Sequence, residues 1–185
     1  MIRKDIKSLI KQYFFTNPSS KLRVREIERT LNLPLPSVIR YCKELKNEKI
    51  LKIFQIGNSK FYTASNSDTF LLEKKLFNIK SLYVSGLIDF LKKEYNNPAI
   101  ILFGSYFKGE DIETSDIDIY LETPSKKTVK TEKFDKTLNR NVQLFVFKDI
   151  TNIKNKHLAN NIINGITLNN YVGVFKWGNH LGLIV

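Results

Sequence analysis

The stretch AIILFGSYFKGEDIETSDIDIYLE, residues 99–122, sets the expected fold of the second half of this chain. Its first five residues are apolar and lie between Asn97-Pro98 and Gly104-Ser105, a pattern that predicts a short buried strand. At the carboxyl end of that strand, glycine lets the backbone approach a ligand, and Ser105 is expected to open a short helix whose free N–H groups favour an anion. The turn therefore has the features of a phosphate-binding site.

The second half of the stretch predicts a pair of carboxylates on a strand. Residues 115–120, SDIDIY, alternate polar and apolar, so Asp116 and Asp118 are expected on one face and Ile117 and Ile119 on the other. Carboxylates held side by side repel each other unless they share a proton or a cation, and oxygen ligands beside a phosphate site suit Mg2+ or Mn2+. A Gly-Ser turn or an Asp-x-Asp strand alone is common on a solvated surface. In combination they predict metal-dependent phosphoryl or nucleotidyl transfer.

The spacing of Gly104-Ser105, Gly109 and Ser115-Asp116-Ile117-Asp118 resembles the signature of the polymerase β nucleotidyltransferase superfamily, most closely its minimal nucleotidyltransferase members. The resemblance covers about residues 80–170. It implies a nucleoside triphosphate as donor substrate, Mg2+ or Mn2+ as cofactor, and Asp116 and Asp118 as catalytic and metal-binding residues. The nucleotide contacts that it implies are Gly104, Ser105, Lys108 and Ser115.

One position departs from this resemblance. Superfamily members generally place a third carboxylate on the neighbouring strand, and the run expected to form that strand, residues 141–147, offers Gln143 instead. An amide oxygen ligates a metal weakly, carries no charge and cannot act as a base. Two hypotheses therefore stay open for the function. The first is Mg2+-dependent transfer of a nucleoside monophosphate to an acceptor hydroxyl, with Gln143 as a third metal ligand. The second is a catalytically degenerate regulator, or an antitoxin-like protein, whose second domain binds nucleotide or a protein partner such as a ribonuclease toxin.

Composition adds a charge asymmetry. The formal net charge is +12, and residues 1–66 carry 14 Lys or Arg against 5 Asp or Glu. Such an excess predicts a polyanion partner, with double-stranded DNA first, an anionic membrane surface second and a merely solvated basic face as the alternative. The single cysteine, Cys42, excludes an internal disulfide framework, and no apolar run approaches the roughly 18–20 residues that span a bilayer. We expect a cytoplasmic protein that does not bind membranes.

The N-terminal pattern explains where that charge is placed. Apolar residues recur at helical spacing in residues 6–14 and 24–31, and Ser37 is expected to cap a third helix. Two strand-like runs, residues 51–55 and 61–64, then flank Gly57-Asn58, a hairpin signal. Three helices and a basic hairpin resemble a winged helix-turn-helix domain over residues 1–65.

This second resemblance implies that the third helix reads DNA. The DNA contacts that it implies are Ser37, Arg40, Lys43 and, on the hairpin, Lys60. Arg40 suits a guanine edge, because a guanidinium can bond to it bidentately, whereas Lys60 suits a phosphate. Domains of this kind also serve in dimerisation or protein docking, and a homodimer is left open.

The expected fold class is α+β, with a winged helix-turn-helix followed by a nucleotidyltransferase-like mixed sheet with flanking helices. Residues 66–80 should form a helical joint that bends near Ser81, and residues 81–171 the nucleotidyltransferase domain. Within that domain, residues 141–147 should pair beside the aspartate strand and residues 166–168 should form an edge strand. Residues 172–185 have no assignment.

Overall fold

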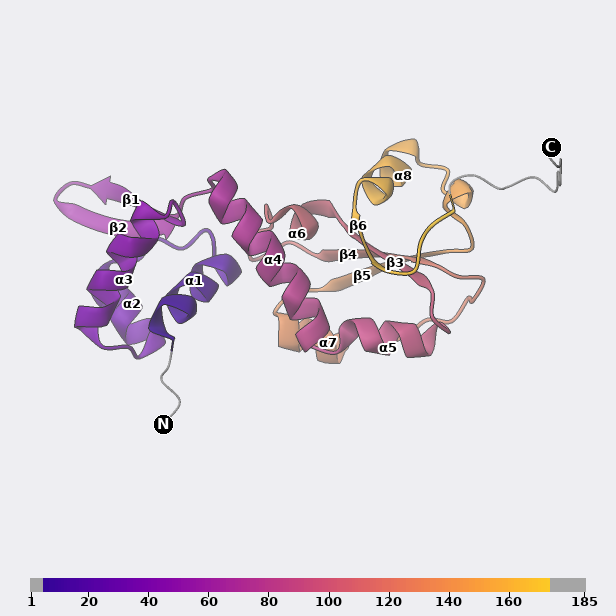
Figure 1. Ribbon diagram of the computed structural model, residues 1–185, viewed down its shortest axis with the longest axis horizontal. Helices are drawn as coiled ribbons and strands as arrows, with labels where there is room; N and C mark the ends of the chain where they lie inside the picture. Colours follow the sequence, from indigo (N-terminus) through magenta and orange to yellow (C-terminus); the bar gives the residue numbers. More distant parts are fainter. Residues whose placement is uncertain (1–4, 174–185) are drawn as a thin grey trace, which may run out of the picture.

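The computed structural model describes residues 5–173 of the chain (Figure 1). The helices and strands, in chain order, are α1 (Ile6–Thr16), α2 (Val24–Leu31), α3 (Leu35–Asn47), β1 (Leu51–Ile56), β2 (Ser59–Ala64), α4 (Asp68–Val84), α5 (Leu87–Glu94), β3 (Ala99–Phe103), α6 (Gly104–Lys108), β4 (Ile117–Glu122), α7 (Glu132–Leu138), β5 (Val142–Phe147), the 3-10 helix η1 (Ile150–Asn152), α8 (Lys156–Ile163) and β6 (Ile166–Asn169). The predicted mixture of helices and strands is confirmed. Most of the unassigned tail, residues 174–185, lies outside the described residues.

The C-terminal part of the molecule is built on a mixed four-stranded sheet with the order β5-β4-β3-β6. Strand β3 runs antiparallel to both β4 and β6, whereas β4 runs parallel to β5. All five residues of β3 are buried, which is why this central strand is apolar throughout. The predictions that residues 141–147 pair beside the aspartate strand, and that residues 166–168 form an edge strand, are confirmed.

The two faces of this sheet have different coverings. Successive strand residues point to opposite faces, so Ile117, Ile119 and Leu121 pack with the apolar residues of α4, α5 and α7. Tyr120, between them, packs on the other face with residues of η1 and α8. Because Asp118 shares the parity of Tyr120, its carboxylate belongs to the face that carries α8.

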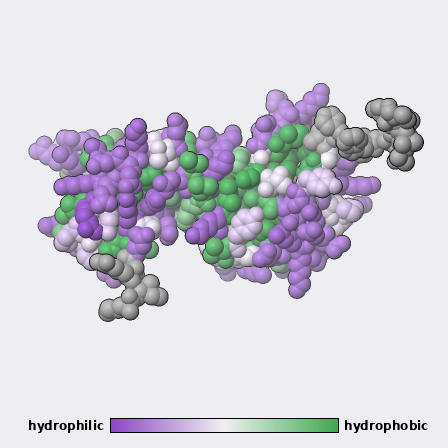
Figure 2. Space-filling model, in the orientation of Figure 1, coloured by the Kyte–Doolittle hydropathy of each residue, from purple (hydrophilic) through white to green (hydrophobic). Residues whose placement is uncertain are grey.

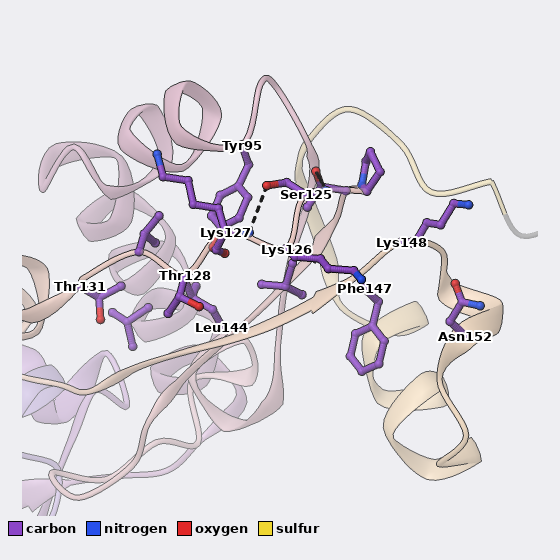
Figure 3. A pocket seen from close by; sticks show the side chains of 15 residues that line it. Tyr95, Ser125, Lys126, Lys127, Thr128, Thr131, Leu144, Phe147, Lys148 and Asn152 are labelled. Atoms are coloured by element: carbon purple, nitrogen blue, oxygen red, sulfur yellow. Dashed lines mark hydrogen bonds between the residues drawn. The ribbon is translucent and has the colours of Figure 1, made fainter.

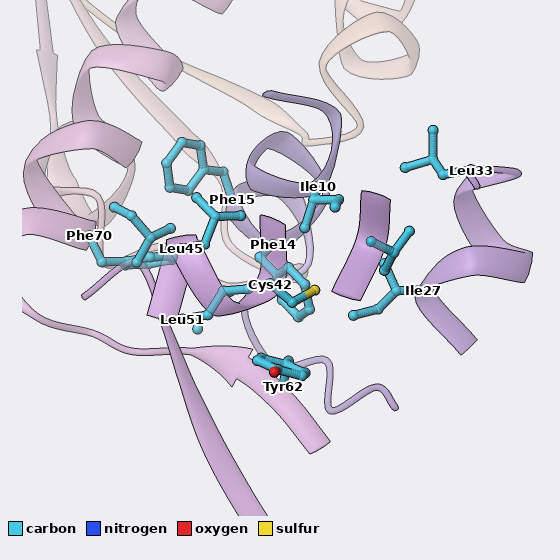
Figure 4. Close-up of a cluster of buried hydrophobic side chains, with 13 residues drawn as sticks. Ile10, Phe14, Phe15, Ile27, Leu33, Cys42, Leu45, Leu51, Tyr62 and Phe70 are labelled. Carbon is cyan, nitrogen blue, oxygen red and sulfur yellow. The ribbon is translucent and has the colours of Figure 1, made fainter. Parts of the chain in front are cut away.

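The N-terminal helices and hairpin enclose a separate core, shown in Figure 4. Cys42 is fully buried in it, as predicted, and burial raises the pKa of its thiol to about 12. The hairpin is tighter than the sequence predicted, because Ile56 pairs with Ser59 and only Gly57 and Asn58 form the turn. Gly57 has φ +53°, which suits the first turn position of a type II′ hairpin.

Helix α3 begins earlier than predicted. Its N-cap is Pro34, so Ser37 lies within the first turn, half-buried, and the prediction that Ser37 caps the helix was wrong. Proline is favoured at the start of a helix because its φ is already near the helical value and its missing N–H has no partner there. The same helix still presents Arg40 and Lys43 to solvent.

Helix α4 connects the two cores (Figure 1). Ser67 caps it as predicted, accepting a hydrogen bond from the Phe70 N–H at 3.2 Å. The predicted bend near Ser81 was wrong: the Ser81 hydroxyl donates to the Phe77 carbonyl at 2.8 Å and the helix continues to Val84. The helix buries Phe70 in the N-terminal core and Leu82 in the core of the sheet, so one rigid element contributes to both.

Apolar side chains are also visible on the surface. On the face shown in Figure 2 they gather over the middle of the molecule, and the exposed large apolar residues of α4 are Leu72, Leu76, Tyr83 and Val84. Between residues 5 and 173, no helix combines the length and the apolar character needed to cross a bilayer.

Candidate functional site

The turn after β3 and the carboxylate of β4 meet directly. Phe103, the last residue of β3, pairs with Asp118 in the antiparallel register, which places the following residue, Gly104, beside the Asp118 side chain. Gly104 has φ +75°, and a β-carbon added to it would overlap Asp118 Oδ2. Only glycine satisfies both the left-handed backbone and this close approach. The predicted phosphate turn and the predicted metal ligand therefore form one site.

The two aspartates differ in their surroundings. Asp118 lies in β4 and is half-buried, whereas Asp116 lies one residue before the strand and is exposed. The Asn141 side-chain amide donates to Asp116 Oδ1 at 3.3 Å. The prediction that both residues belong to one strand was therefore wrong for Asp116, which the adjoining loop supplies.

Burial raises the pKa of Asp118, and the nearby charge of Asp116 raises it further. A carboxyl with a raised pKa stabilises the folded state most when protonated, so its contribution falls as the pH rises through that pKa. At neutral pH the ionised Asp118 therefore opposes folding, and a bound cation would offset this cost.

Gln143 stands where the sequence predicted it. It pairs with Asp118 in the parallel register of β4 and β5, and it is exposed on the same face of the sheet. Within residues 5–173, no cluster of three or more Asp, Glu, His or Cys residues is placed to hold a metal ion. Two carboxylates next to a phosphate turn nevertheless fit Mg2+, which often takes one or two carboxylates and completes its shell with water and phosphate oxygens. Asp116 and Asp118 would hold that ion.

The remaining predicted nucleotide contacts have different positions. Ser105 lies in the first turn of α6, half-buried, and Lys108 is exposed at the end of that helix. The Ser115 hydroxyl accepts the Ile112 N–H at 2.9 Å, so it shapes the loop that precedes Asp116. Ser115 and Asp116 both line an open groove of about 500 Å³ between this loop and the end of α7.

A buried charge cluster holds the loop that carries Asp116. Asp111 is 1% exposed and forms an ion pair with Lys74 of α4 at 3.0 Å, while the Asn78 amide donates to Asp111 Oδ1 at 2.8 Å. Arg140, which precedes β5, lies 3.5 Å from Asp111 Oδ2. Sequence reasoning missed this cluster; the one local signal is a lysine amid the apolar residues of α4.

The same loop is tied to the N-terminal helices. Arg140 donates to the Thr16 carbonyl at the end of α1 at 2.8 Å. The backbone N–H and the hydroxyl of Ser19 donate to the Glu113 carboxylate at 3.0 and 2.8 Å. The position of Asp116 is thus supported from both parts of the molecule.

The predicted DNA contacts lie on the N-terminal part. Arg40, Lys43 and Lys60 are exposed and Ser37 is half-buried. The Arg40 guanidinium lies over the ring of Tyr41, 4.4 Å from its centre. Two cations that the sequence analysis did not single out lie over the hairpin: Lys21 over Phe54 at 4.4 Å and Arg23 over Phe61 at 5.0 Å. Phe54 and Phe61 are cross-strand partners, so these cations share one face of the hairpin with aromatic rings.

Comparison with known proteins bears on the C-terminal part. No curated protein and no solved structure matches the chain. The family model described as nucleotidyltransferase domain matches residues 84–167, from the end of α4 into β6. That span contains the Gly104 turn, both aspartates and Gln143, so the match supports a nucleotidyltransferase domain in the part of the chain that carries the site.

Proposed function

We propose that this protein transfers a nucleoside monophosphate from a nucleoside triphosphate to an acceptor hydroxyl, using Mg2+ or Mn2+. The contact between Gly104 and the Asp118 side chain carries the proposal, because it places a phosphate-binding turn directly against a metal-binding carboxylate. In this proposal, residues 81–171 form the transferase domain and residues 66–80 the joint.

The residues of the chain have distinct roles in this reaction. The open backbone at Gly104 and Ser105 receives the phosphates, and Asp116 and Asp118 hold the cation. When bound, the cation would neutralise charge that develops on the phosphate oxygens. Lys108, exposed at the end of α6, is positioned for an additional phosphate contact.

The pairing of Asp118 with Gln143 favours a second candidate function. With an amide in place of a third carboxylate, the site keeps a place for one cation and its nucleotide but lacks a base on β5. The protein would then be a regulator, or an antitoxin-like protein, that binds nucleotide or a protein partner without turnover.

One experiment separates these functions. The full chain is incubated with each labelled nucleoside triphosphate and Mg2+, in the presence of DNA, RNA or protein acceptors. We expect label transfer by the wild type and its loss by about a hundredfold or more in Asp118→Asn, as is common when a charged catalytic group is removed. Asp89→Asn, a change at an exposed residue of α5, is the matched control and should transfer as the wild type does.

The degenerate alternative predicts another pattern. The wild type should be silent, Gln143→Asp should gain transfer because a third carboxylate can assist deprotonation of the acceptor, and Asp118→Asn should still lose Mg2+-dependent nucleotide binding. If Asp118→Asn binds and transfers like the wild type, the site is elsewhere and both functions are refuted.

We further propose that residues 1–65 form a winged helix-turn-helix that binds double-stranded DNA, with α3 as its recognition helix. Three helices, a two-stranded hairpin and 14 Lys or Arg against 5 Asp or Glu in residues 1–66 support this. Arg40 and Lys43 on α3 would face the bases, and Lys60, with the cations over the hairpin, the phosphates.

A further inference from the structure

A cavity of about 640 Å³ lies on the side of β5 that faces away from Gln143 (Figure 3). Because strand residues alternate, Val142, Leu144 and Val146 line it while Gln143 points to the opposite face. Residues 123–131, the connection between β4 and α7, form its other wall. Its volume lies within the range of roughly 300–1,000 Å³ that is usual for small-molecule sites.

Contacts within the wall hold this cavity open. The Tyr95 hydroxyl donates to the Lys127 carbonyl at 2.9 Å, and the Lys127 N–H donates to the Ser125 hydroxyl at 3.2 Å, the bond drawn in Figure 3. The Lys127 ammonium forms an ion pair with Glu94. The connection is thus anchored at its middle even though it forms neither helix nor strand.

Two lysines at the cavity have no acidic partner. Lys126 and Lys148 both line it, and among the residues the structure describes neither forms an ion pair. None of the described lining residues is Asp or Glu. Two ammonium groups on one cavity repel each other, and an anion between them would remove that repulsion.

The surrounding sequence carries the same sign of charge. Residues 123–156 hold nine Lys or Arg against three Asp or Glu, whereas residues 97–122 hold one against six. The two segments nearly cancel when the C-terminal half is counted together. The carboxylate site and the cavity therefore differ in charge, and an anion reaches the cavity without a metal ion.

We propose that this cavity is a second ligand site, distinct from the carboxylate pair, that takes a small organic phosphate. Its phosphate meets Lys126 and Lys148, and its apolar or aromatic body lies on Val142, Leu144 and Val146. Inorganic phosphate leaves this apolar floor uncovered, and an uncharged apolar ligand leaves the two lysines unneutralised. Both parts of the ligand are thus required.

The test uses adenosine monophosphate as the probe, with the full chain in EDTA, so that metal-dependent binding at Asp116 and Asp118 does not contribute. By calorimetry, we expect adenosine monophosphate to bind about tenfold or more tightly than either adenosine or inorganic phosphate. Replacing both lysines, Lys126→Gln with Lys148→Gln, should weaken its binding by about tenfold or more, since each charged hydrogen bond contributes on this scale.

The matched control removes the same charge nearby. Lys154 and Lys156 are exposed lysines of the same basic segment that do not line the cavity, and their double change to Gln should leave binding within about twofold. Equal weakening in the two double variants, no binding by the wild type at millimolar probe, or loss of binding in Asp118→Asn would overturn the proposal. Because this assay contains no metal, its result is independent of the transferase assay.

Discussion

At the scale of single residues, the candidate site depends on a glycine that has two reasons to be glycine. Gly104 and Gly86 have nearly the same backbone angle, with φ +75° and +78°, but a β-carbon at Gly86 meets nothing within 4 Å. At Gly104 it would meet the Asp118 carboxylate. The pair thus separates backbone strain from the contact that defines the site.

We expect Gly86→Ala to lower the free energy of unfolding by about 1–2 kcal/mol, the cost of a left-handed alanine, and Gly104→Ala to lower it by about 1 kcal/mol more. In an Asp118→Ala background the additional loss should disappear, because the remaining Asp118 β-carbon lies at an ordinary 3.4 Å. Urea unfolding of the four variants gives the coupling. Equal losses for both glycines in the wild-type background would show that Asp118 does not restrict Gly104.

At the scale of elements, α4 and the loop before β4 are joined through buried charge. Burial lowers the pKa of Lys74, and its contact with Asp111 opposes part of that effect. Asp111 is the only anion of the cluster formed with Lys74 and Arg140, so the two cations depend on it. This makes the aspartate more important for stability than either cation alone.

Asp111→Asn should lower the free energy of unfolding by about 3–5 kcal/mol, because it leaves two buried cations without an anion. Lys74→Met should cost much less, since Arg140 still balances Asp111, and in the Asp111→Asn background it should restore part of the loss. Asp89→Asn, at an exposed surface pair, should change stability by less than about 1 kcal/mol. If Asp111→Asn and Asp89→Asn unfold alike in urea, the cluster does not stabilise the loop.

At the scale of the whole molecule, the basic N-terminal part and the sheet form one connected body. Phe70 of α4 is buried in the N-terminal core, Lys11 of α1 forms an ion pair with Glu73 of α4 at 2.5 Å, and Arg140 bonds to the Thr16 carbonyl. Removing the first 66 residues would uncover Phe70 and open the charge cluster. DNA binding is therefore best tested with point variants of the full chain.

The full chain should bind duplex DNA with an affinity that falls steeply as salt rises, because each neutralised phosphate releases counterions. Lys43→Gln with Lys60→Gln should weaken binding and lower the salt slope by about 1–2, near 0.9 for each lost phosphate contact. Lys126→Gln with Lys148→Gln removes the same charge from the other end of the molecule and should leave the slope unchanged. Fluorescence anisotropy at several salt concentrations measures both. A flat salt response, or equal effects of the two pairs, would contradict DNA binding by the N-terminal part.

Local pattern was sufficient for most of the elements and for the candidate site. The strand at 99–103, the turn at Gly104 and the carboxylates lie within 24 consecutive residues, and Gln143 could be placed because a parallel strand pairs in register with its neighbour. Where local prediction failed, a longer-range preference decided. Ser81 stays helical because α4 must reach both cores, and α3 starts at Pro34 because proline suits a first turn better than Ser37 does.

The sequence by itself determined which chemical groups are available and how neighbouring ones alternate, because strand and helix periods act over a few residues. Only the tertiary structure decided which distant groups meet. Lys74, Asp111 and Arg140 come from three separate segments, and Lys126 and Lys148 share a cavity only because β5 lies between the connection at 123–131 and the turn that follows it. Burial and charge pairing depend on every element packed around a residue, and no local period in the sequence encodes them.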